Sequence, residues 1–579
     1  AQPNACHSCG PSLWACDARG RKIAGGEEAL QHVVELLQCG KIVAVKGLGG
    51  FHLACDARLD SAVSLLRERK RRPHRPFAVM AKEPASAEKL VYLTERGRDC
   101  LTSSRRPIVL CQSRPDSGLS PLLNPGLDTI GVMLPYTPLH HLLLENLDVL
   151  VMTSANMSEE PIVADNGQAI RKLGSLVDAF LMHDRDIHMR VDDSVVSVAG
   201  NRSFYTRRAR GLVPLPLFLH EKGPSVLAAG AEMKSTFSVT HQGNLFPSQY
   251  LGDLKEMPAS DYYREALVHF LSLYGMKPRF LVHDLHPQYL STRICTETVP
   301  ELEGRIGVQH HHAHLAACLF ENRHREPAVG LILDGTGYGT DGTVWGGEFL
   351  WGDATFCERL GNLLPFSLLG GEKAVWEPWR TAYALAMESC GSVEAASLVP
   401  RTLDGLKLPP EDLVAALKAG VRTTSCGRLF DGVSSLLGYG DVVSYDGQAP
   451  MFLEAASRGS GTLPFSIFED GRMNILDWRP AIRAILGSSA REAPGRLAAA
   501  FHNGFALSLA EIAEKLATKM GTRHVALSGG VWQNRRLFTL VSAHLVKRGL
   551  HVLAHTLLSP NDECVSVGQA VIGHEKWRL

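Results

Sequence analysis

Four histidines within five residues form the clearest candidate for metal chemistry in this chain. His310, His311, His312 and His314 follow an apolar run that ends near Gln309, so we expect them where a strand gives way to a helix. Residues four apart on a helix share one face, and His310 and His314 could therefore bind the same cation. A lone histidine in an apolar setting is usually a core residue, but four at one junction indicate a metal site.

Two aspartates could complete such a site. Asp334 follows the apolar run 328–333 and precedes a Gly-Thr-Gly segment whose small residues suit a phosphate cradle. Asp562 follows Ser559-Pro560, ahead of a helical pattern at the end of the chain. Each has a structural alternative, because Asp334 could simply form a turn before glycine and Asp562 could simply cap the helix.

A separate stretch of the chain suits the handling of phosphates. The run from Arg67 to Arg75 has six Arg or Lys residues in nine positions, and Pro73 and Pro76 indicate an exposed loop. Cations in such a loop can neutralise a polyphosphate. The alternative is a solvated helix face.

Two turns near this run have matching chemistry. Lys46 ends an apolar run and precedes Gly-Leu-Gly-Gly, so backbone N–H groups and one ammonium could meet a phosphate there. Ser154 and Asn156 follow the apolar run 149–152, at the strand end where open α/β sheets bind ligands. A plain tight turn and a helix N-cap are the structural alternatives.

The cysteines suggest one metal knuckle and otherwise reduced thiols. Cys6 and Cys9 form a C-x-x-C pair typical of half a structural zinc site, and the chain has no second such pair. The 13 cysteines are odd in number and scattered through apolar segments, which favours a cytoplasmic protein. Because the sequence opens next to this motif without Met, we expect it to be truncated upstream.

The composition excludes several classes of function. Lys plus Arg and Asp plus Glu both number 60, so no overall field attracts nucleic acid or membranes. No stretch approaches the roughly 20 apolar residues of a membrane span. The hydrophobic content of 45% and the charged content of 21% are typical of globular domains.

Strand and helix patterns alternate from Lys41 onward, which predicts an α/β fold. The two prolines in the segment 210–216 mark a boundary, and a second α/β series begins near Val226. We therefore expect a zinc-finger remnant over residues 1–25, one domain over 26–215 and another over 216–579.

The first series resembles the YrdC family. The resemblance rests on Lys46-Gly47-Leu48-Gly49-Gly50-Phe51, on the basic loop and on Thr153-Ser154-Ala155-Asn156. It implies a twisted mixed sheet with helices and the condensation of ATP with a carbamoyl-type carboxylate, which releases pyrophosphate and leaves an acyl adenylate. The residues it implies for this site are Lys46, Arg69, Lys70, Arg72, Ser154 and Asn156.

The second series resembles the actin-like fold, and within it the TsaD and carbamoyltransferase branch. The motifs are H-x-x-x-H, the Asp-Gly-Thr segment, Ser-Gly-Gly, a late Asp and Tyr445-Asp446-Gly447-Gln448-Ala449. The resemblance implies a two-lobed, duplicated RNase H-like domain with His310, His314, Asp334 and Asp562 as metal ligands and Mg²⁺ accompanying ATP. For the nucleotide it implies Gly335, Thr336, Gly337, Gln448, Glu454, Ser528, Gly529, Gly530 and Asn534.

The order of these parts resembles the HypF family of nickel–iron hydrogenase maturation. That resemblance implies carbamoyl transfer, starting from carbamate or carbamoyl phosphate, to the C-terminal Cys of the partner HypE, with later dehydration to a cyanide ligand. Zinc or iron would suit two imidazoles with carboxylates. The family's upstream acylphosphatase-like domain is not in this sequence, and Asp562-Glu563-Cys564-Val565 departs from the expected D-G-G-[IL].

Three other functions stay open at this point. A fused threonylcarbamoyl-adenosine maker would act on tRNA and depend on threonine, and an O-carbamoyltransferase of antibiotic biosynthesis would need a sugar hydroxyl. The run from Arg67 to Arg75 could also belong to a non-catalytic RNA-binding scaffold, whose affinity would fall steeply with salt. That last reading leaves the histidine cluster unexplained.

Overall fold

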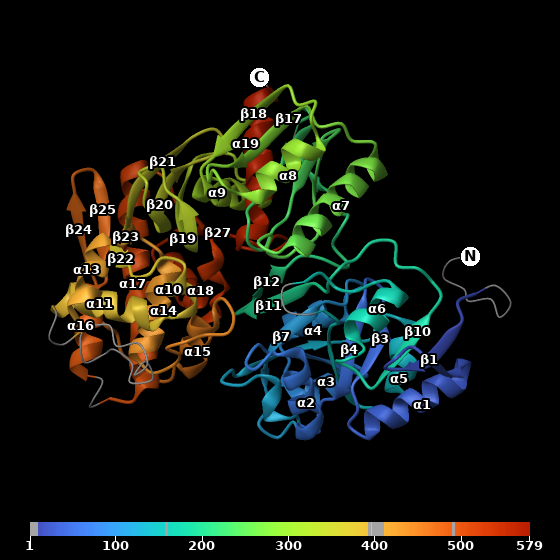
Figure 1. Cartoon of the computed structure of the whole chain (residues 1–579). Helices are drawn as coiled ribbons and strands as arrows, with labels where there is room; N and C mark the ends of the chain where they lie inside the picture. Colours follow the sequence, from blue (N-terminus) through green and yellow to red (C-terminus); the bar gives the residue numbers. More distant parts are fainter. Residues whose placement is uncertain are drawn as a thin grey trace. The chain divides into compact units, whose positions relative to one another are not determined.

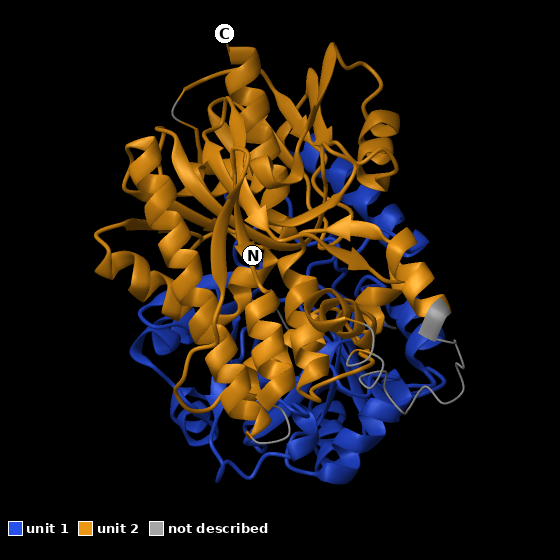
Figure 2. Ribbon diagram, turned by 90° about the vertical axis from the view of Figure 1, so that its left-hand side faces the viewer, with its two compact units in different colours: residues 1–215, 248–273 blue, residues 216–247, 274–579 orange. Residues whose placement is uncertain are grey.

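The computed structural model describes residues 10–156, 160–219, 221–391, 395, 410–488 and 492–578. Two compact units are distinguished (Figures 1 and 2): residues 1–215 with 248–273, and residues 216–247 with 274–579. The chain leaves the first unit at Leu215, and a later stretch returns to it. The sequence predicted one domain boundary after residue 215, and a single boundary does not describe a chain in which residues 248–273 belong to the first unit.

The first unit is built on one twelve-stranded mixed sheet, in the order β12-β11-β7-β8-β5-β9-β4-β3-β10-β1-β2, with β6 beside β7. Its elements are β1 (Leu13–Asp17), β2 (Lys22–Gly25), α1 (Gly26–Gln38), β3 (Val43–Lys46), β4 (Phe51–Asp56), α2 (Asp60–Lys70), β5 (Ala78–Ala81), α3 (Pro84–Leu90), β6 (Val91–Tyr92), α4 (Glu95–Thr102), β7 (Ile108–Ser113), β8 (Thr129–Met133), α5 (Pro138–Leu144), β9 (Val149–Ser154), α6 (Asn166–Leu173), β10 (Ala179–His183), β11 (Val195–Ala199), β12 (Arg202–Arg207) and α7 (Met257–Tyr274).

Helices cover both faces of this sheet because its central strands are apolar on both sides. In β3, Val43 and Val45 pack in the core that contains α1, whereas Ala44 packs in the opposite core that contains α2. This alternation follows from the two-residue period of a strand. The buried sheet leaves its strand ends and the loops beyond them for polar chemistry.

The second unit contains two sheets with the same topology. In the first sheet the order β16-β15-β14-β17-β18 has two antiparallel pairings followed by two parallel pairings, and in the second the order β21-β20-β19-β26-β27 has the same pattern. Such a repeat is the duplicated RNase H-like arrangement, so the predicted fold class is confirmed.

The first lobe contains β13 (Leu217–Phe218), β14 (Val226–Ala228), β15 (Ser238–His241), β16 (Asn244–Pro247), β17 (Phe280–Asp284), α8 (Leu290–Thr298), β18 (Gly304–Val308), α9 (His310–Glu321) and α19 (Val565–Arg578). The remaining elements are β19 (Ala328–Tyr338), β20 (Val344–Gly352), β21 (Cys357–Leu363), β22 (Phe366–Leu368), α10 (Lys373–Trp376), α11 (Trp379–Cys390), α13 (Pro410–Ala419), β23 (Val421–Thr423), α14 (Cys426–Leu436), α15 (Gln448–Ala456), β24 (Ser466–Asp470), β25 (Met473–Asp477), α16 (Arg479–Ser488), α17 (Pro494–Met520), β26 (His524–Ser528), α18 (Arg535–Lys547), β27 (His551–Ala554) and the 3₁₀ turns Gly530–Gln533 and Asp562–Cys564.

Helices α9 and α19 pack closely against each other, and this contact fixes the histidine cluster relative to the end of the chain (Figure 1). A Cβ on Gly568 would lie 1.8 Å from the carbonyl oxygen of Ala313, so only glycine permits this approach. Because Asp562 lies just before α19, the contact brings it next to the histidines of α9. Across the described part of the chain, no helix is long and apolar enough to cross a membrane.

Candidate functional site

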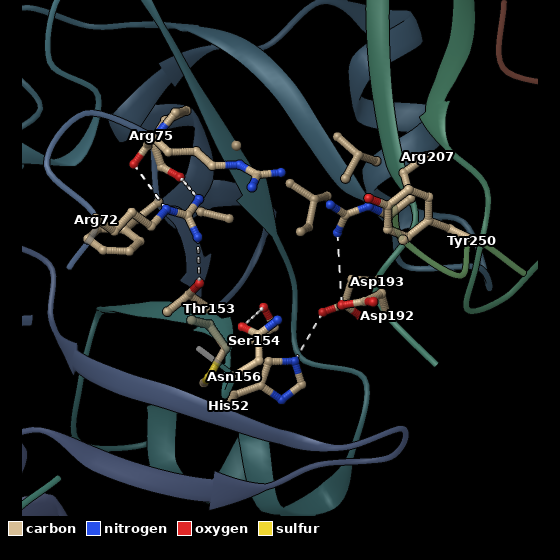
Figure 3. Close-up of a pocket in the computed structure, with 18 of the residues that line it drawn as sticks. His52, Arg72, Arg75, Thr153, Ser154, Asn156, Asp192, Asp193, Arg207 and Tyr250 are labelled. Atoms are coloured by element: carbon tan, nitrogen blue, oxygen red, sulfur yellow. Dashed lines mark hydrogen bonds and ion pairs between the residues drawn. The ribbon is translucent and has the colours of Figure 1, made fainter. Parts of the chain in front are cut away.

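The first unit contains a cavity of about 260 Å³ whose walls are rich in cations (Figure 3). Its lining includes Lys70, Arg72 and Arg75 from the basic run, together with Ser154 and Asn156 from the turn after β9. Two sequence motifs that are about eighty residues apart thus meet in one hollow. A polyphosphate is the ligand that such a set of donors would suit.

Lys70 organises the turn after β9. Its Nζ donates to the carbonyl oxygens of Ser154 at 2.8 Å and Asn156 at 2.7 Å, and to Asn156 Oδ1 at 2.9 Å. Burial, reinforced by the neighbouring Arg72 and Arg75, lowers the pKa of Lys70 to about 7. The ammonium is therefore poised near neutrality, and an anion in the cavity would stabilise its charged form.

The buried side chain of Arg67 holds the backbone of the basic loop in place. Its guanidinium donates to the carbonyl oxygens of Leu122, Leu123, Arg72, Pro73 and Arg75 at 2.6 to 3.2 Å. Arg72 in turn donates to Arg75 O and, at 3.4 Å, to Thr153 Oγ1 (Figure 3). Within the charge run, Arg67 thus shapes the loop, whereas Lys70, Arg72 and Arg75 line the cavity.

Two predicted site residues do not line this cavity. Arg69 pairs with Asp178 at 3.1 Å, because adjacent residues on α2 point in directions about 100° apart and Lys70 takes the cavity side. Lys46 is buried and donates to the carbonyl oxygen of His183 at 3.1 Å. Its burial lowers its pKa, against the opposing pull of Asp186, Asp165 and Asp184.

The sequence prediction missed the opposite part of the wall. His52 lies in the cavity lining with its Nε2 3.2 Å from Asp193 Oδ2 (Figure 3). Arg210 donates to Asp193 Oδ1 at 2.6 Å. Tyr250 and Tyr262 also line it, from the stretch 248–273 that returns to this unit. His52 directly follows the quoted glycine motif, so a signal existed, whereas nothing local marks the two tyrosines.

In the second unit, the structure brings His310, His314, Asp334 and Asp562 together. One ligand atom from each lies within 4.8 Å of the others. The imidazoles come from the first turns of α9, Asp334 from β19 and Asp562 from the 3₁₀ turn before α19. Two strand-to-helix junctions and one strand therefore converge where the sequence predicted a metal.

The atoms in this cluster fit a bound cation. The Nε2 atoms of both histidines and Oδ2 of Asp334 are buried and have no hydrogen-bond partner among the described residues. Burial and the adjacent Asp334 raise the pKa of Asp562 to about 7, which is the expected result of placing two carboxylates together without a counter-ion. A divalent cation would relieve this repulsion and satisfy the orphan atoms.

Protein groups hold the second nitrogen of His310 and the second oxygen of Asp334. Asp284 Oδ2 lies 2.8 Å from His310 Nδ1, and Asp334 Oδ1 accepts the N–H of Gly530 at 2.9 Å. Such outer contacts orient metal ligands. Asp284 is the last residue of the apolar strand β17, and Asp334 likewise follows an apolar run. The same signal, an aspartate at the end of a strand, could therefore have predicted Asp284.

Two glycines of the predicted nucleotide loops are required by close packing. Gly529 has φ +106°, and a Cβ there would lie 2.2 Å from the carbonyl oxygen of Leu333. A Cβ on Gly337 would lie 2.4 Å from His311. Thr336 is exposed and Gly335 partly so, which leaves this segment open to a ligand.

The other predicted nucleotide residues have protein partners. Ser528 Oγ lies 3.1 Å from His314 Nδ1. Gln448 Oε1 accepts from Ser444, Glu454 lies 3.3 Å from Arg535, and Asn534 caps α18 through Leu537 N. These four side chains therefore shape the loops around the site.

Two cations near the cluster were not predicted. Lys234 Nζ lies 3.1 Å from Asp446 Oδ2, and Arg428 lies 3.6 Å from Asp446 Oδ1. Lys234 also has a positive φ of 45°, which is unusual outside glycine. Asp446 belongs to the Tyr-Asp-Gly-Gln segment, which is thereby tied to both cations. The predicted ligands Cys6 and Cys9 lie outside the described residues.

Comparisons with known proteins agree with this division. Residues 35–209 match the Sua5/YciO/YrdC family, described as "Telomere recombination". Residues 221–321 match the "HypF Kae1-like domain", and residues 330–569 match "Carbamoyltransferase, Kae1-like Domain, second subdomain". A YrdC-like unit followed by a duplicated Kae1-like unit defines a carbamoyltransferase.

Whole-chain relatives are more specific. The chain is 40% identical to carbamoyltransferase HypF of Rhizobium leguminosarum bv. viciae, over 93% of this chain and 71% of that protein. It is also 40% identical to HypF of Rhodobacter capsulatus, over 100% of this chain and 77% of that protein. The chain belongs to the HypF family of carbamoyltransferases.

Solved structures agree over the same extent. The crystal structure of full-length HypF in its phosphate- and nucleotide-bound form matches with a TM-score of 0.93 at 36% identity, covering 100% of this chain and 75% of that one. The structure of HypF from T. kodakarensis also has a TM-score of 0.93, at 34% identity, covering 99% and 77%.

Proposed function

We propose that the first unit forms carbamoyl adenylate from ATP and carbamate, and that the second unit transfers the carbamoyl group to the C-terminal Cys of HypE. One observation carries this proposal: a single chain of the HypF family has both a cation-lined cavity and a separate cluster of two histidines and two aspartates. Activation and transfer would thus have separate sites.

The cavity of the first unit suits adenylation. A carbamate oxygen attacks the α-phosphorus of ATP, the bond between the α- and β-phosphates breaks, and pyrophosphate leaves with that electron pair. The protein needs to supply charge and position rather than a covalent nucleophile. Lys70, Arg72 and Arg75 would neutralise the triphosphate with its Mg²⁺, and the turn at Ser154 and Asn156 would hold the reacting end.

The cluster of the second unit suits the transfer step. Zinc or iron on His310, His314, Asp334 and Asp562 would supply Lewis acidity towards the bound nucleotide or carbonyl. The acceptor thiol loses its proton to water and its sulfur attacks the carbamoyl carbon. The bond from that carbon to the phosphate oxygen breaks, and AMP leaves with the electron pair. The backbone of Gly335 and the side chains of Lys234 and Arg428 would hold the phosphate of the nucleotide.

The product of this transfer is a thiocarboxamide, which dehydration would convert to the cyanide ligand of a nickel–iron hydrogenase. An acceptor thiol must stay reduced, and this requirement places the reaction in the cytoplasm. Carbamate itself would come from carbamoyl phosphate. One related chemistry, threonylcarbamoyl transfer to tRNA, becomes an outcome of the test below.

Exchange of labelled pyrophosphate into ATP, with ammonium bicarbonate as the carbamate source, tests the proposal. We expect exchange by the wild type, its loss in Lys70→Ala and its retention in His310→Ala. Lys82→Ala, which removes an exposed lysine of the same unit, is the matched control. Exchange that needs threonine would move the protein to the tRNA-modifying class, and exchange lost in His310→Ala would refute separate sites.

A further inference from the structure

A buried chain of hydrogen bonds leads from His314 away from the metal cluster. His314 Nδ1 lies 3.1 Å from Ser528 Oγ, Ser528 Oγ lies 2.9 Å from His555 Nε2, and His555 Nδ1 lies 2.7 Å from Glu321 Oε2. The side chains of Glu321 and His555 are only 3% and 1% exposed. We name these four residues the relay.

The carboxylate at the far end sets the direction of every proton in the relay. Although burial opposes ionisation, the hydrogen bonds from His555 and from the 556–557 backbone lower the pKa of Glu321. An ionised carboxylate can only accept, so His555 Nδ1 donates to it. With a neutral imidazole at His555, Nε2 then accepts from Ser528 Oγ–H, and Ser528 Oγ accepts from His314 Nδ1–H.

This order of donors leaves the lone pair of His314 on Nε2. That atom lies 3.6 Å from Asp334 Oδ2 and 3.9 Å from Asp562 Oδ1, inside the cluster. Metal binding needs the lone pair there, because a nitrogen that bears a proton cannot be a ligand. The relay therefore selects the binding-competent tautomer of His314.

Glu321 also holds the loop that leads to Asp562. Its Oε1 accepts from the backbone N–H of Thr556 at 2.6 Å and from Thr556 Oγ1 at 2.8 Å, and it also accepts from the N–H of Leu557. Glu321 ends α9, the helix that begins with His310 and includes His314. One carboxylate thus connects the helix of two candidate ligands to the loop before a third.

We propose that Glu321, acting through His555 and Ser528, is a positioning residue that presents the Nε2 lone pair of His314 to a divalent cation. The inference rests on the metal site of the proposed function and extends it to three residues outside the ligand set. The cation could be zinc, iron or another metal of similar preference, since the relay orients a nitrogen and does not select an element.

Glu321→Gln reverses the relay with little change in shape. The amide oxygen of Gln can still accept from the loop at 556–557, but its NH₂ would face His555 Nδ1 and would no longer accept the N–H of Leu558, which lies 3.4 Å from Oε2 of Glu321. His555 must then donate from Nε2, Ser528 must donate to His314 Nδ1, and His314 Nε2 must bear the proton. We expect the affinity for a metal to fall about 10- to 100-fold, the range typical of lost outer-shell contacts.

The experiment titrates the full metal-free chain with Co²⁺, whose visible absorption reports the ligands and geometry, and then measures Zn²⁺ affinity by competition. The variants are Glu321→Gln, Ser528→Ala and their double mutant. Glu358→Gln removes an exposed carboxylate of the same unit as a matched control, and thermal unfolding without metal checks the fold.

A second control concerns Cys564, whose Sγ lies 3.3 Å from His314 Nδ1 and could replace Ser528 as its partner. Cys564→Ala should leave the metal affinity within a few-fold of wild type if the relay sets the tautomer. A loss in Cys564→Ala as large as in Glu321→Gln would assign the orientation of His314 to the thiol and overturn the proposal.

Non-additivity separates a relay from a general loss of stability. Once Ser528→Ala has cut the connection, Glu321→Gln should have little further effect on affinity or on the Co²⁺ spectrum. Additive losses, wild-type affinity in Glu321→Gln, or a wild type that binds neither metal would each overturn the proposal. Pyrophosphate exchange in the same samples should be unchanged, and its absence beside normal metal binding would count against the proposed function alone.

Discussion

At the scale of single residues, Lys70 makes a prediction about pH. Its pKa is lowered to about 7, chiefly by burial, so its positive charge is lost as the pH rises through neutrality. An arginine at this position would stay charged over that range. We expect wild-type ATP affinity, relative to Lys70→Arg, to fall about tenfold between about pH 6 and about pH 9, because the neutral amine no longer attracts the triphosphate.

Equilibrium binding of a non-hydrolysable ATP analogue at a series of pH values would measure this ratio. The ionisation of the nucleotide affects both proteins equally and cancels. Parallel pH profiles for the wild type and Lys70→Arg would contradict a titrating ammonium at the phosphate site.

Residue types and spacings predicted those site residues whose positions depend on the local geometry of one helix or strand. His310 and His314 had to share a helix face, and Asp334 followed a buried strand, so their meeting could be expected from the sequence. Arg69 and Lys70 show the limit: adjacent residues of one basic run point apart, and only the packing of α2 decides which reaches the cavity. Partners such as His502 for Asn534 likewise depend on tertiary contacts.

At the scale of elements, the basic loop depends on one buried side chain. Arg67 serves five backbone carbonyl oxygens of the segments 72–75 and 122–123, as a planar fork of donors can. A lysine offers its three protons from a single point and cannot reach them all. We expect Arg67→Lys to destabilise the first unit by about 2–4 kcal/mol, because buried carbonyl groups lose their donors.

Hydrogen exchange with peptide resolution would detect this effect as faster exchange over residues 71–77. Arg69→Lys is the matched control, because Arg69 forms a partly exposed ion pair with Asp178 whose loss should matter much less. Equal protection of the loop in wild type and Arg67→Lys would show that its shape does not depend on the fork.

The helices and strands were easier to predict than the unit in which each of them packs. Strand and helix patterns gave the α/β class and the start of the second series. These patterns could not indicate that the stretch 248–273 packs with the first unit. Hydrophobic periodicity shows that a helix has a buried face, but it does not identify the element that packs against that face. The sequence therefore did not predict that Tyr250 and Tyr262 line the cavity.

At the scale of the whole molecule, the proposed function predicts that the intermediate passes from one site to the other within a single chain. Carbamoyl adenylate is a mixed anhydride that water destroys, and tethering keeps the effective concentration of the second site in the millimolar range. Enzyme at micromolar concentration offers far fewer sites to an intermediate that escapes. Activation and transfer should therefore be inefficient when the two steps take place on different molecules.

An equimolar mixture of Lys70→Ala and His310→Ala tests this expectation, because each variant keeps only the site that the other has lost. We expect about a hundredfold less carbamoylated acceptor peptide from the mixture than from the same amount of wild type, in line with the lost effective concentration. The His310→Ala partner must still exchange pyrophosphate, which shows that it makes the intermediate. If the mixture approached wild-type yield, carbamoyl adenylate would be a diffusible product and the two units would be independent enzymes.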